Sequence, residues 1–123
     1  ELGILERSPR KLPWAESPFF DFYRRLFTLY RKHPALYRGD FRCVALDVPG
    51  VYALVRRSEG DCVAAAFNLS GEPAPCVLAD LPRDLPHGRR VFREIFSEEE
   101  RLAADLAAQP LELAPWGYSV WAN

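Results

Sequence analysis

The chain has 123 residues, of which 49% are hydrophobic and 27% charged, and its 16 basic residues nearly balance its 17 acidic ones. This is the composition of a folded globular domain with a real core, and it argues against a disordered or membrane-spanning chain. The basic residues are dispersed along the sequence, so we expect neither a nucleic-acid partner nor a membrane partner.

One amphipathic helix is predicted near the N-terminus, over residues 18–33. Ser17 followed by Pro18 is typical of a helix start, because the hydroxyl accepts a hydrogen bond from the first turn and proline sacrifices none there. Pro34 ends the helix, since a residue before proline avoids the α region. Apolar side chains recur at helical spacing and form a stripe that another surface must cover. The stripe consists of Phe19, Phe22, Tyr23, Leu26, Leu29, Tyr30 and His33.

After Leu36 the pattern becomes that of β-strands. Short runs rich in Val, Ala and aromatic residues alternate with turn residues, which indicates antiparallel strands joined by tight turns. At least six short strands need two facing sheets to bury their apolar sides. The predicted fold is therefore mainly β, an antiparallel β-sandwich with Greek-key connections, preceded by one amphipathic α-helix. The expected strands are residues 40–46, 51–57, 62–68, 74–78, 90–96, 111–113 and 117–121.

Several local patterns have structural interpretations. Ser97 and Glu100 form a capping-box pattern that favours a short helix after the strand over residues 90–96. His33 is expected to cap the end of the first helix. The sequence Asn68-Leu69-Ser70 fits the N-glycosylation motif, but we expect Asn68 to close a turn with its side-chain amide.

The chain offers few candidates for metal binding or catalysis. Its three cysteines lie in apolar runs without Cys-x-x-Cys spacing, so we expect no metal site. Buried free thiols are the preferred interpretation, and one disulfide with a leftover thiol is the alternative. The carboxylates at turns are expected to be structural. The cysteines are Cys43, Cys62 and Cys76, and the turn carboxylates are Asp47, Glu59, Asp61, Asp80 and Asp84.

The stretch FYRRLFTLYRKHPALYRGDF (residues 22–41), together with residues 67–70, resembles the end of the α-amylase family of glycoside hydrolases. In that family a helix with the pattern FYRRLIxLRKxHPALxxG closes the (β/α)8 barrel and a small β-domain follows. The resemblance implies that residues 1–36 are the loop and last helix of such a barrel and residues 37–123 a C-terminal β-sandwich. It also implies a turn between strands after Ser97, in place of the helix that the local pattern favours.

The resemblance implies a function for the chain that is not itself catalytic. A retaining glycosidase uses two carboxyl groups about 5–5.5 Å apart, and in the family these lie on central barrel strands upstream of the closing helix. We therefore expect no catalytic residue and no cofactor in this chain, and calcium would belong to the parent protein. The chain is predicted to be the non-catalytic C-terminal part of a retaining α-glucan-active glycoside hydrolase, covering and stabilising the barrel of the same polypeptide.

Two alternatives stay open, an independent carbohydrate-binding β-module and a plain interaction module. Neither explains the apolar helix stripe, which a barrel-closing helix requires. Without the barrel, part of that stripe should stay exposed and drive self-association. For contact with an α-glucan, the candidates are Trp116, which follows Pro115 at a corner, and Tyr118 beside it, whereas Trp121 is expected in the core.

Overall fold

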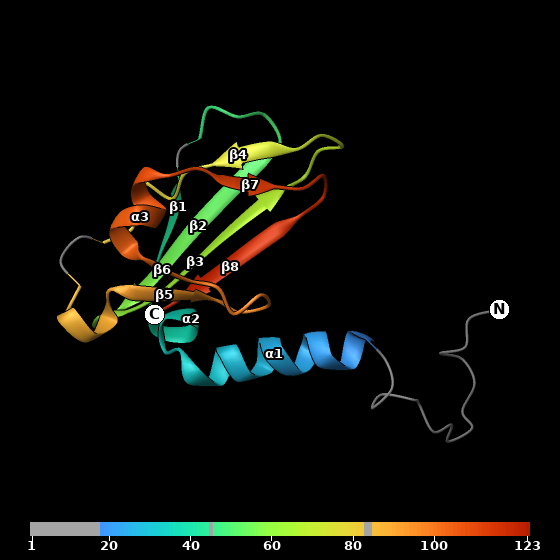
Figure 1. Ribbon diagram of the computed structural model, residues 1–123. Helices are drawn as coiled ribbons and strands as arrows, with labels where there is room; N and C mark the ends of the chain where they lie inside the picture. Colours follow the sequence, from blue (N-terminus) through green and yellow to red (C-terminus); the bar gives the residue numbers. More distant parts are fainter. Residues whose placement is uncertain (1–17, 45, 83–84) are drawn as a thin grey trace, which may run out of the picture.

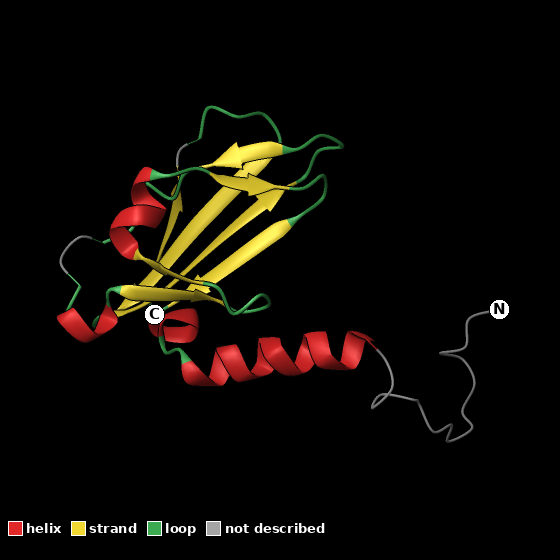
Figure 2. Ribbon diagram, in the orientation of Figure 1, coloured by secondary structure: helices red, strands yellow, loops and turns green. Residues whose placement is uncertain are grey.

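The described part of the chain, residues 18–44, 46–82 and 85–123 of a computed structural model, forms a six-stranded antiparallel sheet and a two-stranded sheet (Figures 1 and 2). The helices are α1 (Pro18–Lys32), α2 (Ala35–Arg38), the 3-10 turn η3 (His87–Arg89) and α3 (Ala103–Ala108). The strands are β1 (Asp40–Val44), β2 (Val51–Ser58), β3 (Asp61–Asn68), β4 (Ala74–Cys76), β5 (Val91–Glu94), β6 (Glu100–Leu102), β7 (Leu111–Leu113) and β8 (Tyr118–Ala122). The strand order is β1-β2-β3-β8-β5-β6 in the large sheet, and β4 pairs with β7 in the small one.

The hairpin of β2 and β3 forms the middle of the large sheet. Ser58 pairs with Asp61, and the two residues between them, Glu59 and Gly60, have φ angles of 47° and 89°. Positive φ at both positions is the mark of a type I′ turn, whose twist matches that of the strands it joins. On its other side β3 pairs with β8, so the sheet unites strands from the middle and the end of the sequence.

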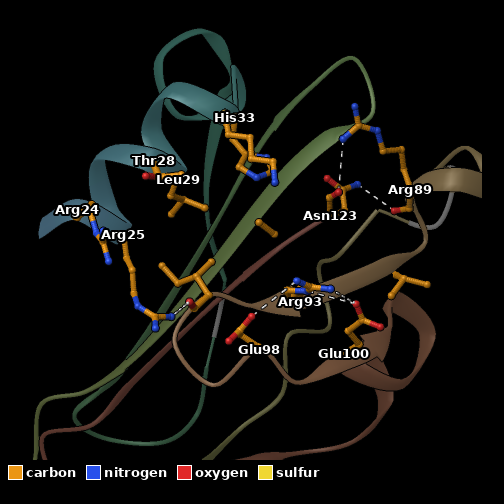
Figure 3. Close-up of a pocket in the computed structure, with 14 residues that line it drawn as sticks. Arg24, Arg25, Thr28, Leu29, His33, Arg89, Arg93, Glu98, Glu100 and Asn123 are labelled. Carbon is orange, nitrogen blue, oxygen red and sulfur yellow. Dashed lines mark hydrogen bonds and ion pairs between the residues drawn. The ribbon is translucent and has the colours of Figure 1, made fainter. Parts of the chain in front are cut away.

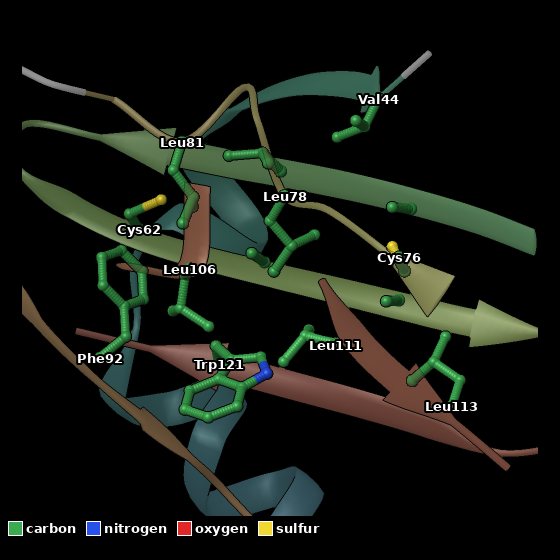
Figure 4. Close-up of a cluster of buried hydrophobic side chains, with 14 of the residues drawn as sticks. Val44, Cys62, Cys76, Leu78, Leu81, Phe92, Leu106, Leu111, Leu113 and Trp121 are labelled. Carbon is green, nitrogen blue, oxygen red and sulfur yellow. The ribbon is translucent and has the colours of Figure 1, made fainter. Parts of the chain in front are cut away.

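The main hydrophobic core lies between the large sheet, the small sheet and α3 (Figure 4). Alternate residues of β3 face this core, whereas Val63 and Ala65 belong to a second cluster on the other face of the sheet. The strand is therefore buried on both faces, which explains its run of small apolar residues. The fully buried large side chains include Leu78, Leu85, Phe92, Leu106 and Trp121.

The fold class predicted from the sequence is confirmed, with a helix followed by an antiparallel β-sandwich. Helix α1 ends at Lys32, just before Pro34, although the short α2 that follows was not predicted. Trp121 is 1% exposed, which confirms its expected place in the core. The Greek-key connection pattern stays a prediction.

The helix predicted from Ser97 is wrong, and the turn implied by the family resemblance is found instead. Ser97 Oγ accepts a hydrogen bond from the Glu99 amide at 3.3 Å, and Glu98 has a φ of 65°, so the chain turns here and continues into β6. The buried carboxylate of Glu94 stabilises this turn, accepting from the amides of Phe96 at 2.9 Å and Ser97 at 2.7 Å. A tertiary contact thus overrides the local capping pattern, and α3 begins only at Ala103.

The cysteine predictions are confirmed for two of the three thiols. All three are free, but only Cys62 and Cys76 are buried, whereas Cys43 is exposed. Cys43 lies on the edge strand β1, whose first four residues are exposed, so the apolar run around it does not become core. Burial raises the pKa of the Cys62 thiol to about 12 and also raises the pKa of Cys76.

Some predictions fall on residues that the structure does not describe. These are residues 1–16, Ser17, Asp84 and the side chain of Phe19. Among the helices that are described, none has the length and apolar content needed to cross a membrane.

Candidate functional site

Helix α1 packs on the face of the large sheet opposite the main core (Figure 1). Leu29 is buried there, and Phe22 and Leu26 are half-buried. The ring of Phe22 stacks on Phe96 with centroids 5.5 Å apart, and Tyr118 meets both rings edge-on at 6.2 Å and 5.4 Å. One half of the predicted apolar stripe is therefore covered by the chain's own sheet.

A second set of apolar side chains on α1 is exposed, and only Tyr23 and Tyr30 of this set belong to the predicted stripe. Phe20, Tyr23, Phe27 and Tyr30 lie along one side of α1 at three- and four-residue spacing, and Phe27 is 65% exposed. Tyr37 of α2 extends this surface, with its ring centroid 5.3 Å from that of Tyr30. We call these five residues the outer aromatic face. The predicted stripe omits Phe20 and Phe27 because it covers one narrow side of the helix, whereas the apolar surface of α1 is wide enough for two partners.

His33 and Asp61 join the end of α1 to the start of β3. His33 Nδ1 lies 2.7 Å from Asp61 Oδ1, and the amide of Ala35 donates to Asp61 Oδ2 at 2.9 Å. Both side chains are buried, and Arg89 lies 3.7 Å from the same carboxylate. The expectation that His33 caps the helix carbonyls is wrong, because its ring is held by Asp61. The carboxylate in turn bonds the first amide of α2.

A groove of about 930 Å³ runs between α1 and β5 (Figure 3). Its polar groups are largely occupied by contacts within the chain. Arg25 donates to the carbonyl of Ile95 at 2.9 Å, and Arg93 lies 2.7 Å from Glu100, an ion pair that raises the pKa of Arg93. The Arg25 contact holds α1 against the β5–β6 turn, and the Arg93–Glu100 pair joins β5 to β6.

Trp116 occupies an exposed corner, as its position after Pro115 predicts. It is 67% exposed and has a φ of 58°, a conformation that costs a non-glycine residue roughly 1–2 kcal/mol. The turn is closed by the bond from the Gly117 amide to the Ala114 carbonyl at 2.8 Å, and the Trp116 amide donates to the Ser70 carbonyl at 3.1 Å. These bonds fix the backbone of the turn, from which the exposed indole projects.

Asn68 supports the Trp116 corner from inside the protein. Its side chain is fully buried, and Nδ2 donates to the carbonyls of Glu72 at 2.7 Å and Ala114 at 3.0 Å. Its Oδ1 accepts from the amide and the hydroxyl of Ser70 at 3.1 Å and 2.7 Å. The prediction that Asn68 closes a turn is confirmed, and its amide is not available to a glycan.

Among the residues that the structure describes, no three His, Cys, Asp or Glu side chains are placed to share a metal ion. Asp47, Glu59 and Asp80 are exposed, while Asp61 is committed to His33 and Ala35. Tyr118 lies with Phe22 and Phe96 rather than standing free beside Trp116.

Comparison with solved structures finds similar folds, although no protein-family model and no curated protein matches the sequence. Trehalulose synthase MutB, in crystals soaked with trehalulose, superposes with a TM-score of 0.61 over 85% of this chain at 24% identity. A MutB mutant in complex with its substrate sucrose gives 0.59 over 84% at 23% identity, and an inactive double mutant with isomaltulose gives 0.60 over 84% at 23%. The chain spans only 17 to 18% of the length of these proteins.

MutB is an α-amylase family glycosidase, and the matching part is a C-terminal fragment of it. The level of identity of this match establishes likeness of fold. The chain therefore has the fold of the C-terminal part of an α-amylase family glycosidase.

Proposed function

We propose that this chain is the non-catalytic C-terminal part of a retaining, α-glucan-active glycoside hydrolase and that it covers and stabilises the catalytic barrel. Residues 1–36 then end the barrel, and residues 37–123 form the C-terminal β-domain. The observation that carries this proposal is the apolar surface of α1, of which the chain's own sheet covers one half only.

The outer aromatic face is large enough to be an interface. The largest apolar patch on a typical monomer covers about 300–600 Å² and is often functional. Covering these five rings would remove on the order of 400 Å² of apolar surface from water, about 10 kcal/mol as an upper estimate at ~25 cal/mol per Å². A helix with one apolar half on the β-domain and the other half free is the arrangement that joins this domain to a barrel.

An independent carbohydrate-binding module is the second candidate function, favoured by the outward indole of Trp116. It does not account for the outer aromatic face, since a free-standing module gains nothing from four exposed rings on α1 and a fifth on α2. The same objection applies to a plain interaction module that uses only the sheet surface. We therefore place the barrel-covering function first.

The outer aromatic face can be tested by self-association of the chain. Sedimentation velocity of the wild type should show concentration-dependent association, because a second copy covers the face when no barrel does. Phe27→Asp should weaken the association at least tenfold. Trp116→Asp is the matched control, because Trp116 is exposed to nearly the same extent on another surface. A strictly monomeric wild type, or equal effects of the two variants, would argue against the proposal.

A further inference from the structure

The outer edge of β1 is an unpaired strand edge in the described part of the chain (Figure 1). β1 stands at the end of the strand order and pairs with β2 on its inner side. Its first four residues are exposed, and Phe41 is 58% exposed. At the opposite edge of the sheet, β6 is three residues long and leads directly into α3. Because an open strand edge is a template for pairing with another strand, the edge of β1 is a candidate interaction surface.

The backbone groups of Phe41 and Cys43 point away from β2. In an antiparallel pair, residues that bond the neighbouring strand alternate with residues whose backbone groups point outward. Ser58 and Asp61 flank a two-residue turn and therefore form a hydrogen-bonded pair. It follows that the odd-numbered residues of β2 bond β1, where they lie opposite its even-numbered residues. Within the described part of the chain, the N–H and C=O groups of Phe41 and Cys43 thus remain available to a further strand.

The charges of β1 favour one way of pairing two copies. Asp40 and Arg42 are two residues apart, so their side chains share one face of the sheet. A symmetric antiparallel pair has a two-fold axis. With the axis at Phe41, Asp40 of each copy faces Arg42 of the other. With the axis at Arg42, two guanidinium groups face each other, and with the axis at Cys43, Arg42 faces the apolar Val44. Only the first register sets opposite charges against each other.

We propose that β1 pairs with β1 of a second copy of this chain, antiparallel and with the two-fold axis at Phe41. The two Phe41 residues exchange both backbone hydrogen bonds, and their rings form an aromatic cross-strand pair on one face of the joined sheets. On the other face, Asp40 and Arg42 form two ion pairs between the copies. The contact uses no residue of the outer aromatic face, so it goes beyond the barrel-covering function and does not rest on it.

The edge contact is short, so the dimer should be weak. The Gly39 carbonyl already accepts a hydrogen bond from Arg56 Nη2 at 3.2 Å, and the Gly39 amide donates to the Ala35 carbonyl at 3.1 Å. These bonds confine the new ladder to the residues next to Phe41. An interface of this extent falls below the ~1,200 Å² of a standard protein–protein contact and belongs to the weak class.

The test measures self-association in the Phe27→Asp background, which removes association through the outer aromatic face. Sedimentation equilibrium at up to about 1 mM protein should show a dimer of this background. Asp40→Arg or Arg42→Asp places like charges opposite each other twice and should weaken the dimer at least about fivefold. The double variant with both exchanges restores opposite charges and should recover the dimer. A mixture of the two single variants should also associate, because each supplies the charge that the other lacks.

Glu112→Arg is the matched control, because it makes the same change of charge as Asp40→Arg at an exposed strand residue of the small sheet. It should leave the dimer unchanged. The amide resonances of residues 42 and 44, whose backbone groups bond β2, report whether each variant keeps β1 in the sheet. A background that stays monomeric, a double variant that does not recover, or equal weakening by Glu112→Arg would overturn the proposal.

The register has a separate test by oxidation in the same background. Phe41→Cys combined with Cys43→Ser should form a disulfide between copies, because the Cα atoms of a hydrogen-bonded pair lie about 5.5 Å apart. The native Cys43 residues of the two copies would lie roughly 13 Å apart along the strands and should cross-link far more slowly. An equal or faster rate through Cys43 would contradict the axis at Phe41. Failure of either test leaves the barrel-covering function standing, because that function depends on Phe27 and not on Asp40 or Arg42.

Discussion

Replacing Asp61 by Ala should destabilise the chain strongly, because this carboxylate joins α1 and α2 to the central hairpin. The substitution removes the acceptor for His33 Nδ1 at 2.7 Å and for the Ala35 amide at 2.9 Å. Both partners are buried, so no water replaces the lost bonds in the folded state. Asp61 also lies 3.7 Å from Arg89, which contributes less because that side chain is half-exposed.

The expected loss in the free energy of unfolding is about 3–5 kcal/mol. Each of the two buried partners, the His33 ring and the Ala35 amide, is left unsatisfied at a cost of ~1–3 kcal/mol. Breaking one side of a buried pair costs a similar total. Asp61→Asn keeps one oxygen for the Ala35 amide and should lose about 1–2 kcal/mol. In a double-mutant cycle, His33→Ala and Asp61→Ala together should lose less than the sum of the single losses, by roughly 0.5–3 kcal/mol.

Urea unfolding followed by circular dichroism measures these losses. With a slope of about 1.5 kcal/mol per M, the midpoint of Asp61→Ala should fall by roughly 2–3 M. Asp47→Ala is the control, because Asp47 is an exposed turn carboxylate and should change stability by less than about 0.5 kcal/mol. A loss for Asp61→Ala as small as that of the control would refute the reasoning.

Four further predictions follow from the buried groups and from the proposed function. A thiol reagent at pH 8 should label Cys43 in the native chain and all three cysteines only in denaturant, and native labelling of Cys62 would contradict its burial. Folding raises the pKa of the Cys62 thiol from its usual 9.0 to about 12, so between these pH values the thiol keeps its proton in the folded state and has lost it in the unfolded state. The free energy of unfolding should therefore fall as the pH rises from 9.0 to about 12. The fall should be less steep in Cys62→Ala. Glu94→Gln should lower the free energy of unfolding by about 2–3 kcal/mol, since the carboxylate accepts from the amides of Phe96, Ser97 and Val120; an unchanged urea midpoint would disprove that role. Incubation of the chain with starch, maltotriose or an aryl α-glucoside should release no product above buffer, and turnover proportional to the purified protein would contradict its assignment as non-catalytic.

Local periodicity predicts much of this fold because it reflects which faces are buried. The apolar strand runs over residues 51–57 and 62–68 and the helix before Pro34 appear in the structure nearly as expected. The pairing of β3 with β8, and of β8 with β5, has no local signal, since it depends on how distant strands share one core. Likewise, the helix start at Ser97 fails because Glu94, a residue of the preceding strand, bonds the turn amides.

Of the candidate site, the sequence predicts only the part that depends on a local turn. Pro115 predicts the exposed corner at Trp116, and the corner is found. The contact of His33 with Asp61 joins residues 28 positions apart, and neither the helix pattern nor the turn pattern indicates it. The burial of the Trp121 indole beneath β7 likewise depends on contacts between distant strands, which only the packed structure reveals.

The most direct test of the central claim is the mass and sequence of the natural protein that contains this chain. An antibody raised against residues 18–123 would isolate it for intact mass measurement and peptide sequencing. The account predicts a protein several times larger than the 14.0 kDa of this chain, with barrel strands upstream that carry two carboxyl groups of a retaining glycosidase. A natural protein of about 14 kDa, or one whose upstream region has no such barrel, would contradict it.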